Sequence, residues 1–419
     1  MSQSHLARQL GTGDAVVIGL CAMIGAGVFV VFAPAAQAAG ADLLIGLVIA
    51  AVVAFCNAVS AAQLAIAYPS SGGAYHFGRI VLGPWWGFLA GWGFVIGKTA
   101  SCAAMAMTFA AHALPEASSW WHRLLAAAAV VTLTAANLRG IHRTALVARV
   151  LLGATLLTLG MVIIVCTAGE AGNPDAWRSG DHGGLPGVLQ AAGLFFFAFA
   201  GFARMATLAE EVRRPQLLGR AILIALGIAV TVYALVAVSL MRVLGAGLSD
   251  ALTPAAVAAE ATGGTWAGVV VRVGAMAACL GSLLALLAGV SRTVLAMARE
   301  RDLPRVLASV DTRHHVPDHA QVVISVGIIV LVALTDVRTA IGFSSFGVLV
   351  YYAVTNLAAL RQPREERRWP RALNVVGLVA CVVLALSLPP AAVLMAAAVG
   401  CIGVVGRVAH QRAGGTAAQ

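Results

Sequence analysis

The chain has 419 residues, of which 60% are hydrophobic and 11% charged, and its mean hydropathy is +0.92. A water-soluble protein of this length would need more polar surface, so the composition indicates a polytopic membrane protein. The net charge of +10 comes from arginines in the amino-terminal tail and in every second loop. This pattern orients a membrane protein and does not form a nucleic-acid-binding surface. It predicts a multi-pass protein of the inner cell membrane with both termini in the cytoplasm.

Long apolar segments follow one another along the whole chain, separated by short loops, and we expect twelve membrane-spanning helices. In chain order the predicted spans are 14–36, 41–66, 83–110, 122–139, 145–168, 188–209, 218–243, 267–298, 320–335, 337–360, 372–388 and 389–409. The last two are divided only by Leu388-Pro389-Pro390.

The first span is interrupted in its middle by Met23-Ile24-Gly25-Ala26-Gly27-Val28-Phe29. Two glycines weaken a helix, and an unwound backbone is tolerated in a membrane only where it lines a cavity or is buried in protein. Free N–H groups at the start of a half-helix can bind an anion. We therefore predict that Ile24, Gly25, Ala26 and Gly27 bind a substrate carboxylate.

The sixth span repeats the anomaly five spans later, in the run 194–202. Two disrupted spans at matching positions of two five-span halves are typical of an inverted-repeat transporter whose site lies at mid-membrane. The alternative is that the glycines of these two spans only allow close helix packing.

The second break is expected to supply acceptors, because unpaired carbonyls in a dry site need a donor. We predict that the carbonyls of Phe197, Ala198 and Ala200 accept hydrogen bonds from a substrate ammonium. Phe202, just after the break, is a candidate aromatic gate, and the alternative is a ring that faces lipid or the core.

Four motifs in order resemble the permeases of the amino acid–polyamine–organocation superfamily, over spans one to ten. They are 19–29 in the first span, 68–75 with 83–92 around the second loop, 209–215 after the sixth span, and 291–304 at the end of the eighth. The resemblance implies an all-α, LeuT-like fold with a five-plus-five inverted repeat, and transport of amino acids or related amines. The first repeat would be 14–168, the second 188–360, the two peripheral helices 372–409, and the cytoplasmic tails 1–13 and 410–419.

Lys98, the only lysine of the chain, lies near the middle of the third span. A charge at this depth is costly unless it faces the interior, so it is functional by default. Many relatives carry a lysine in the fifth span, against the carbonyls of the first, where this chain has Thr155. Lys98 is a candidate to fill the same void and to carry a proton, with Thr155 and Ser282 as further coupling residues. The alternative is a static cation bonded to backbone carbonyls.

A second departure from the family concerns Ala203, where relatives often have an acid, next to the unusual Arg204. This change favours neutral or acidic substrates over dibasic ones. The alternative is that Arg204 pairs with Glu210 or Glu211. Asp and Glu are absent from the middle of every predicted span, which argues against a carboxylate proton relay.

The cytoplasmic side carries two further features. The turn at 70–75 leads into a short amphipathic helix that would close the inner path, and its simpler interpretation is a plain tight turn. The charges of Arg292, Arg299 and Glu300 at the end of the eighth span are interpreted as loop pairing and snorkelling, with a gating role as the alternative.

Together these features predict a secondary active transporter of amino acids or related amines, coupled to protons by symport. The alternatives are an exchanger without proton coupling and a non-transporting substrate sensor on the same fold. The sequence predicts no enzyme and no cofactor. The seven cysteines lack metal-ligand spacing, no protease motif is present, and a retinal-type Schiff base would want seven spans and a buried counter-ion.

Overall fold

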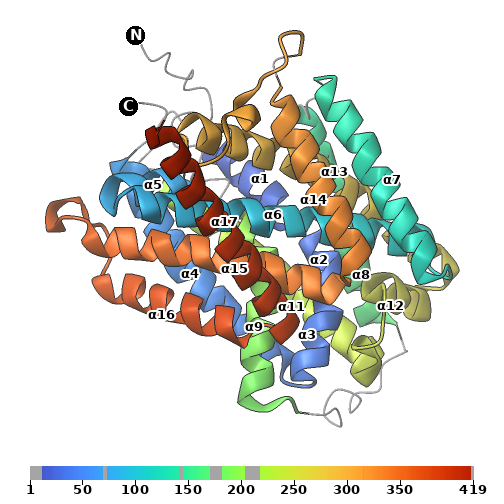
Figure 1. Ribbon diagram of the computed structural model, residues 1–419. Helices are drawn as coiled ribbons and strands as arrows, with labels where there is room; N and C mark the ends of the chain where they lie inside the picture. The colour runs from blue at the N-terminus through green and yellow to red at the C-terminus, as the bar shows by residue number, and fades with distance from the viewer. Residues whose placement is uncertain are drawn as a thin grey trace.

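The computed structural model describes residues 12–68, 73–140, 145–169, 182–202, 218–314 and 316–416. Within these ranges the chain is helical and forms no strand, and one antiparallel bridge pairs Gly40 with His182 (Figure 1). In hydrocarbon every backbone polar group must be satisfied internally, and a helix does this within one segment.

The first half contains α1 (Thr12–Met23), α2 (Gly27–Val30), α3 (Phe32–Ala39), α4 (Leu43–Ala67), α5 (Gly73–Val81), α6 (Pro84–Ala113), α7 (Ser119–Leu138) and α8 (Ala145–Ala168). The second half begins with α9 (Gly184–Phe199), η1 (Ala200–Phe202), α11 (Leu218–Leu244), η3 (Gly245–Leu248), α12 (Pro254–Gly263) and α13 (Thr265–Arg299). It ends with η4 (Arg305–Ala308), α14 (Asp318–Leu334), α15 (Val337–Arg361), η5 (Arg364–Glu366), α16 (Arg371–Ser387) and α17 (Pro390–Thr416).

Each predicted apolar segment coincides with one or more of these helices, apart from the end of the sixth span, which lies outside the described residues. Proline marks two of the predicted boundaries, because Pro84 and Pro390 each open a helix, where a missing N–H costs nothing. Eight helical segments of the described chain are long and apolar enough to cross a membrane, while α9, α14 and α16 are apolar but shorter. The total of twelve crossings therefore stays a prediction.

One connection differs from the expected short loops. Between α11 and α13 the chain forms η3 and the ten-residue helix α12, whose apolar face is buried. Pro254 starts this helix and Gly264, at φ 81°, ends it. The run 254–263 is too short to span a membrane, but it is apolar enough to pack against α13 and α8.

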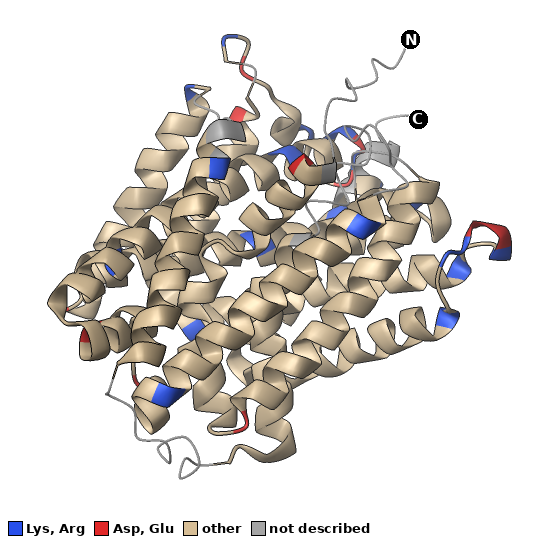
Figure 2. Ribbon diagram, turned by 180° about the vertical axis from the view of Figure 1, so that it is seen from behind, with Lys and Arg blue, Asp and Glu red and all other residues tan. Residues whose placement is uncertain are grey.

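The helix α6 forms the centre of the molecule, where it packs most extensively against α15 and α13 and passes behind α15 and α17 in Figure 1. Small residues let α6 and α15 approach closely, and a Cβ added at Gly347 would lie 2.8 Å from the Cα of Gly97. Figure 2 shows the charged residues mostly at helix ends and in loops, with long uncharged stretches between them. Lys98 is thus held on the candidate membrane span with the largest buried share among the described helices.

Candidate functional site

The first span is broken where the glycines predict it. The helix α1 ends at Met23, and the N–H of Ile24 makes the last helical hydrogen bond, 2.7 Å long, to the carbonyl of Leu20. Helical structure resumes with α2 at Gly27. Among the described residues, none accepts a hydrogen bond from the N–H groups of Gly25, Ala26 or Gly27. The break therefore presents buried donors that have no partner in the described part of the chain.

The second break begins where α9 ends. The helix stops at Phe199 and tightens into the 3-10 turn η1, with the N–H of Ala200 bonded to the carbonyl of Phe196. The continuation of this span, with Arg204 and its suggested partners Glu210 and Glu211, lies outside the described residues.

The two breaks touch each other. A Cβ added at Gly27 would lie 3.0 Å from the Cα of Ala198, and Gly201 rests against the carbonyl of Ala22 at the end of α1. At Gly201 a side chain would collide with the backbone of Ala22 and Met23, and at Gly27 a Cβ would be a tight contact that larger side chains make worse. The donors of the first break and the acceptors of the second are therefore parts of one buried region.

Tyr233 of α11 joins the two breaks and was not anticipated from the sequence. Its side chain is fully buried, and its hydroxyl donates to the carbonyl of Met23 at 2.6 Å and to that of Ala198 at 3.2 Å. Its ring packs on Phe199, with centroids 5.1 Å apart. The only available signal was that a tyrosine inside an apolar helix needs a hydrogen-bond partner.

Lys98 lies against the second break. The side chain is 7% exposed, and its Nζ donates to the carbonyl of Ala200 over a long 3.5 Å. The sequence placed this ammonium against carbonyls of the first span, whereas the described contact is with η1. A cation at this point bridges the central helix α6 and the end of α9.

The other predicted residues divide into two groups. Ser282 of α13 lies directly against Gly25, since a Cβ on that glycine would collide with the Ser282 hydroxyl. Thr155 of α8 is buried, and its hydroxyl donates to the carbonyl of Leu151 in its own helix at 2.8 Å. The structure places the backbone of Phe202 at the end of η1, and the orientation of its ring lies outside the described side chains.

Polar side chains join the start of α15 to the half-helices α3 and α9. Arg338 at the start of α15 donates to the amide oxygen of Gln37 on α3 at 3.2 Å and to that of Gln190 on α9 at 2.9 Å. Gln37 continues to the carbonyl of Ser249, and Gln190 to that of Ser387. We call Arg338, Gln37 and Gln190 the amide cluster. It ties together the half-helices that follow the first break and precede the second.

A buried ion cluster joins the segment after α13 to α5 and α17. Asp302, 2% exposed, accepts from Tyr75 at 2.8 Å and Arg79 at 3.1 Å, both on α5, and pairs with Arg407 of α17 at 2.7 Å. Burial, and then the hydrogen bond to Asp302, raise the pKa of the Tyr75 phenol, so that it stays a neutral donor. We call Asp302, Tyr75, Arg79 and Arg407 the carboxylate cluster.

The expected loop pairing at the end of the eighth span is present for one residue, since Glu300 pairs with Arg79 at 3.2 Å. The predicted turn before α5 lies mostly outside the described residues, but the short helix that follows it is formed. It belongs to the carboxylate cluster through its residues Tyr75 and Arg79.

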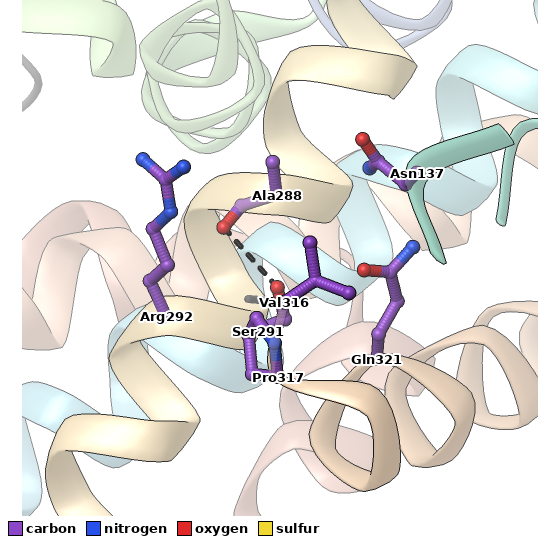
Figure 3. Close-up of a pocket in the computed structure, with 7 residues that line it drawn as sticks. All are labelled: Asn137, Ala288, Ser291, Arg292, Val316, Pro317 and Gln321. Atoms are coloured by element: carbon purple, nitrogen blue, oxygen red, sulfur yellow. Dashed lines mark hydrogen bonds between the residues drawn. The ribbon is translucent and has the colours of Figure 1, made fainter. Parts of the chain in front are cut away.

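A small pocket lies away from the breaks, between α7, α13 and α14 (Figure 3). Its volume of about 10 Å³ holds roughly one water molecule. The amides of Asn137 and Gln321 line it and are bonded to the carbonyls of Leu284 and Thr134. Figure 3 shows Arg292 on the other side of the pocket. This pocket can hold a water molecule between the helices and is too small for an amino acid.

Comparisons with known proteins identify the family to which the chain belongs. A family model described as amino acid permease matches residues 10–405. An uncharacterized transporter of Mycobacterium tuberculosis is 52% identical over 402 residues, which cover 96% of this chain and 90% of that protein.

Two more distant relatives have a stated substrate class. A branched-chain amino acid permease of Bacillus subtilis is 25% identical over 90% of this chain and 85% of its own length. The vacuolar cationic amino acid transporter 4 of Arabidopsis thaliana is 29% identical over 85% of this chain and 63% of its own length. The resemblance seen in the four motifs is confirmed, and the chain is a transporter and not an enzyme. It belongs to the amino acid permease family, within the amino acid–polyamine–organocation superfamily.

Proposed function

We propose that this protein is a secondary active transporter that carries amino acids or closely related amines across the inner cell membrane, in symport with protons. The observation that carries the proposal is the meeting of two helix breaks in a buried region, where no acidic side chain is among the described residues. The first break has N–H groups without a described acceptor, and the second has the carbonyls of a helix end. In the same proposal the chain has twelve spans, a five-plus-five inverted repeat and cytoplasmic termini.

The first break would hold the substrate carboxylate. The N–H groups of Gly25, Ala26 and Gly27 have no described protein acceptor, and buried donors without acceptors are costly. An incoming carboxylate satisfies several of them at once, with charge-assisted bonds. The Ser282 hydroxyl, beside Gly25, is placed to add another donor.

The second break would hold the ammonium. Phe197 and Ala198 lie in the last turn of α9, where helical carbonyls lack their usual partners. The carbonyl of Ala198 shares one hydroxyl proton with Met23, so it has acceptor capacity left. A zwitterion whose ends reach both breaks fits an amino acid, and the absence of a described carboxylate there favours uncharged side chains over dibasic ones.

Proton coupling would depend on Lys98. While it is protonated, its ammonium donates to the carbonyl of Ala200 and holds η1 against α6. Loss of the proton removes the positive charge and weakens that bond in a dry site. The state of Lys98 is thereby linked to the geometry of the second break, where the substrate amine binds.

Alternating access would require the two clusters to open in turn. The amide cluster joins the half-helices α3 and α9, and the carboxylate cluster joins α5, α17 and the end of α13. Rocking of one helix group against the other around a fixed site is the usual movement of such folds.

The test is uptake of labelled amino acids by the purified protein in liposomes with an imposed proton gradient, after thermal-shift screening has selected the ligand. We expect accumulation against a concentration gradient that collapses when a protonophore is added. Uptake only into liposomes preloaded with amino acid would replace symport by exchange. Saturable binding without any flux would replace transport by sensing.

A further inference from the structure

Tyr233 offers one proton to two acceptors. Its hydroxyl lies 2.6 Å from the carbonyl oxygen of Met23 in the first break and 3.2 Å from that of Ala198 in the second. The side chain is fully buried and its ring packs on Phe199, and both described acceptors of the hydroxyl are carbonyls at the breaks. One donor therefore sits between the two broken helices.

Carbonyls freed by helix breaks must be paired in a membrane. In ion-coupled transporters with broken helices, a cation binds to such carbonyls. Here protein groups do so, because Tyr233 pairs with Met23 and Ala198, and Lys98 pairs with Ala200. Three described carbonyls at the two breaks are thus paired with donors from protein side chains.

A phenol suits this position for a physical reason. The phenol hydrogen attracts both carbonyl oxygens, as a small cation between them would. The phenol is neutral and stays in place, whereas a cation would have to lose its hydration water each time it bound. Replacing Tyr233 by phenylalanine keeps the ring that packs on Phe199 and removes one oxygen. The carbonyls of Met23 and Ala198 would then face each other across a void of about one oxygen atom, without a donor.

We propose that Tyr233 is a positioning residue that takes the place of a monovalent cation between the two breaks. The wild-type protein therefore binds substrate without Na⁺, and the Tyr233→Phe variant acquires a Na⁺ site. The inference rests on the proposed function, because it takes the two breaks to form the substrate site. Its readout, cation binding by the purified protein, does not require flux or proton coupling.

The test compares wild type, Tyr233→Phe and a matched control, Tyr351→Phe, in detergent. Tyr351 is also buried, and its hydroxyl accepts from the N–H of Ala74 at 3.0 Å, away from the breaks. Thermal midpoints in NaCl, KCl and choline chloride are recorded with binding of ²²Na⁺. We expect Na⁺ to raise the midpoint of Tyr233→Phe by about 2 °C or more relative to choline. Wild type and Tyr351→Phe should show no difference.

A folded Tyr233→Phe protein that binds no ²²Na⁺ and shows no Na⁺-dependent shift would overturn the inference, because the hydroxyl would then be only a packing contact. Wild type supplies a second measurement should the variant fail to fold. Saturable Na⁺ binding by wild type, or substrate binding that needs Na⁺, would overturn it equally. Failure of proton-driven uptake alone would count against the proposed function and leave the Na⁺ result standing.

Discussion

The two breaks differ in the peptide groups that they leave without a helical partner, which are N–H groups at the first and carbonyls at the second, and in whether side chains pair with those groups. At the first break, the N–H groups of Gly25, Ala26 and Gly27 have no described acceptor. At the second, the carbonyls of Ala198 and Ala200 already receive bonds from protein side chains. A carboxylate can bind to the first break without displacing a described hydrogen-bond acceptor, whereas an ammonium must share or replace a donor at the second. Affinity should therefore depend mainly on the first break and coupling on the second.

The local sequences explain the difference. Glycines at 25 and 27 interrupt the helix and leave no side chain that could fold back onto the backbone. The second break follows a run of phenylalanines that pack tightly and are almost entirely buried. Donors for its carbonyls must then come from other helices, and α6 and α11 supply them.

Gly27→Leu should give the largest effect. A Cβ at this position already comes within 3.0 Å of the Ala198 backbone, so leucine would fill the gap between the breaks. We expect substrate affinity to fall by about 100-fold or more, measured by thermal shift or radioligand binding. Gly227→Leu is the control, because a Cβ at Gly227 meets no atom within 4 Å. Wild-type affinity in a folded Gly27→Leu protein would refute the assignment of the first break.

Replacement of Lys98 tests the second break. Lys98→Ala should abolish gradient-driven accumulation while keeping substrate binding, since the carboxylate site is separate. Lys98→Arg should fail as well, because a guanidinium does not release its proton in the accessible range. Proteoliposome uptake with an imposed gradient measures both, and we expect a loss of about tenfold or more. Equal accumulation by wild type and Lys98→Arg would show that Lys98 is a static cation.

Gly25→Ala should weaken binding at the first break by a smaller amount. The added methyl group would collide with the Ser282 hydroxyl and lie 3.3 Å from the carbonyl of Cys21. We expect about a tenfold loss of affinity, and partial recovery in the Gly25→Ala/Ser282→Gly double variant, which removes the obstructing side chain. Additive losses in the double-mutant cycle would mean that the two residues do not meet in the binding-competent state.

Thr155→Val should have the smallest effect. The hydroxyl of Thr155 donates within its own helix, to Leu151, and no described hydrogen bond joins it to Lys98 or to the breaks. Both accumulation and affinity should change by less than about threefold, the value of one weak hydrogen bond. A loss of coupling as severe as that of Lys98→Ala would place Thr155 in the proton path after all.

Much of this arrangement could be predicted from the sequence, because it depends on local signals. Apolar periodicity located the helices, Pro84 and Pro390 marked boundaries, and the glycines located the first break. The burial of Lys98 was predicted correctly, because a charged side chain in the middle of an apolar span is costly unless it faces the protein interior.

Residues whose importance depends on long-range contacts could not be found in this way. Tyr233 is 210 positions from Met23, and a single tyrosine in an apolar helix gives no sign of its partner. Arg338 and Arg407 look like ordinary charges at the ends of spans, where snorkelling is common. Only the folded chain shows that one belongs to the amide cluster and the other to the carboxylate cluster.

The most direct test of the account is equilibrium binding of three matched ligands to the wild-type protein: the preferred amino acid, its N-acetyl derivative and the amine that lacks the carboxylate. We expect the amine to bind at least about 100-fold more weakly than the amino acid, because it leaves the N–H groups of the first break unpaired. The N-acetyl derivative should also lose affinity, but by a smaller factor, since the carbonyls of the second break keep Tyr233 and Lys98 as donors. An amine that binds as tightly as the amino acid would contradict the assignment of the two breaks.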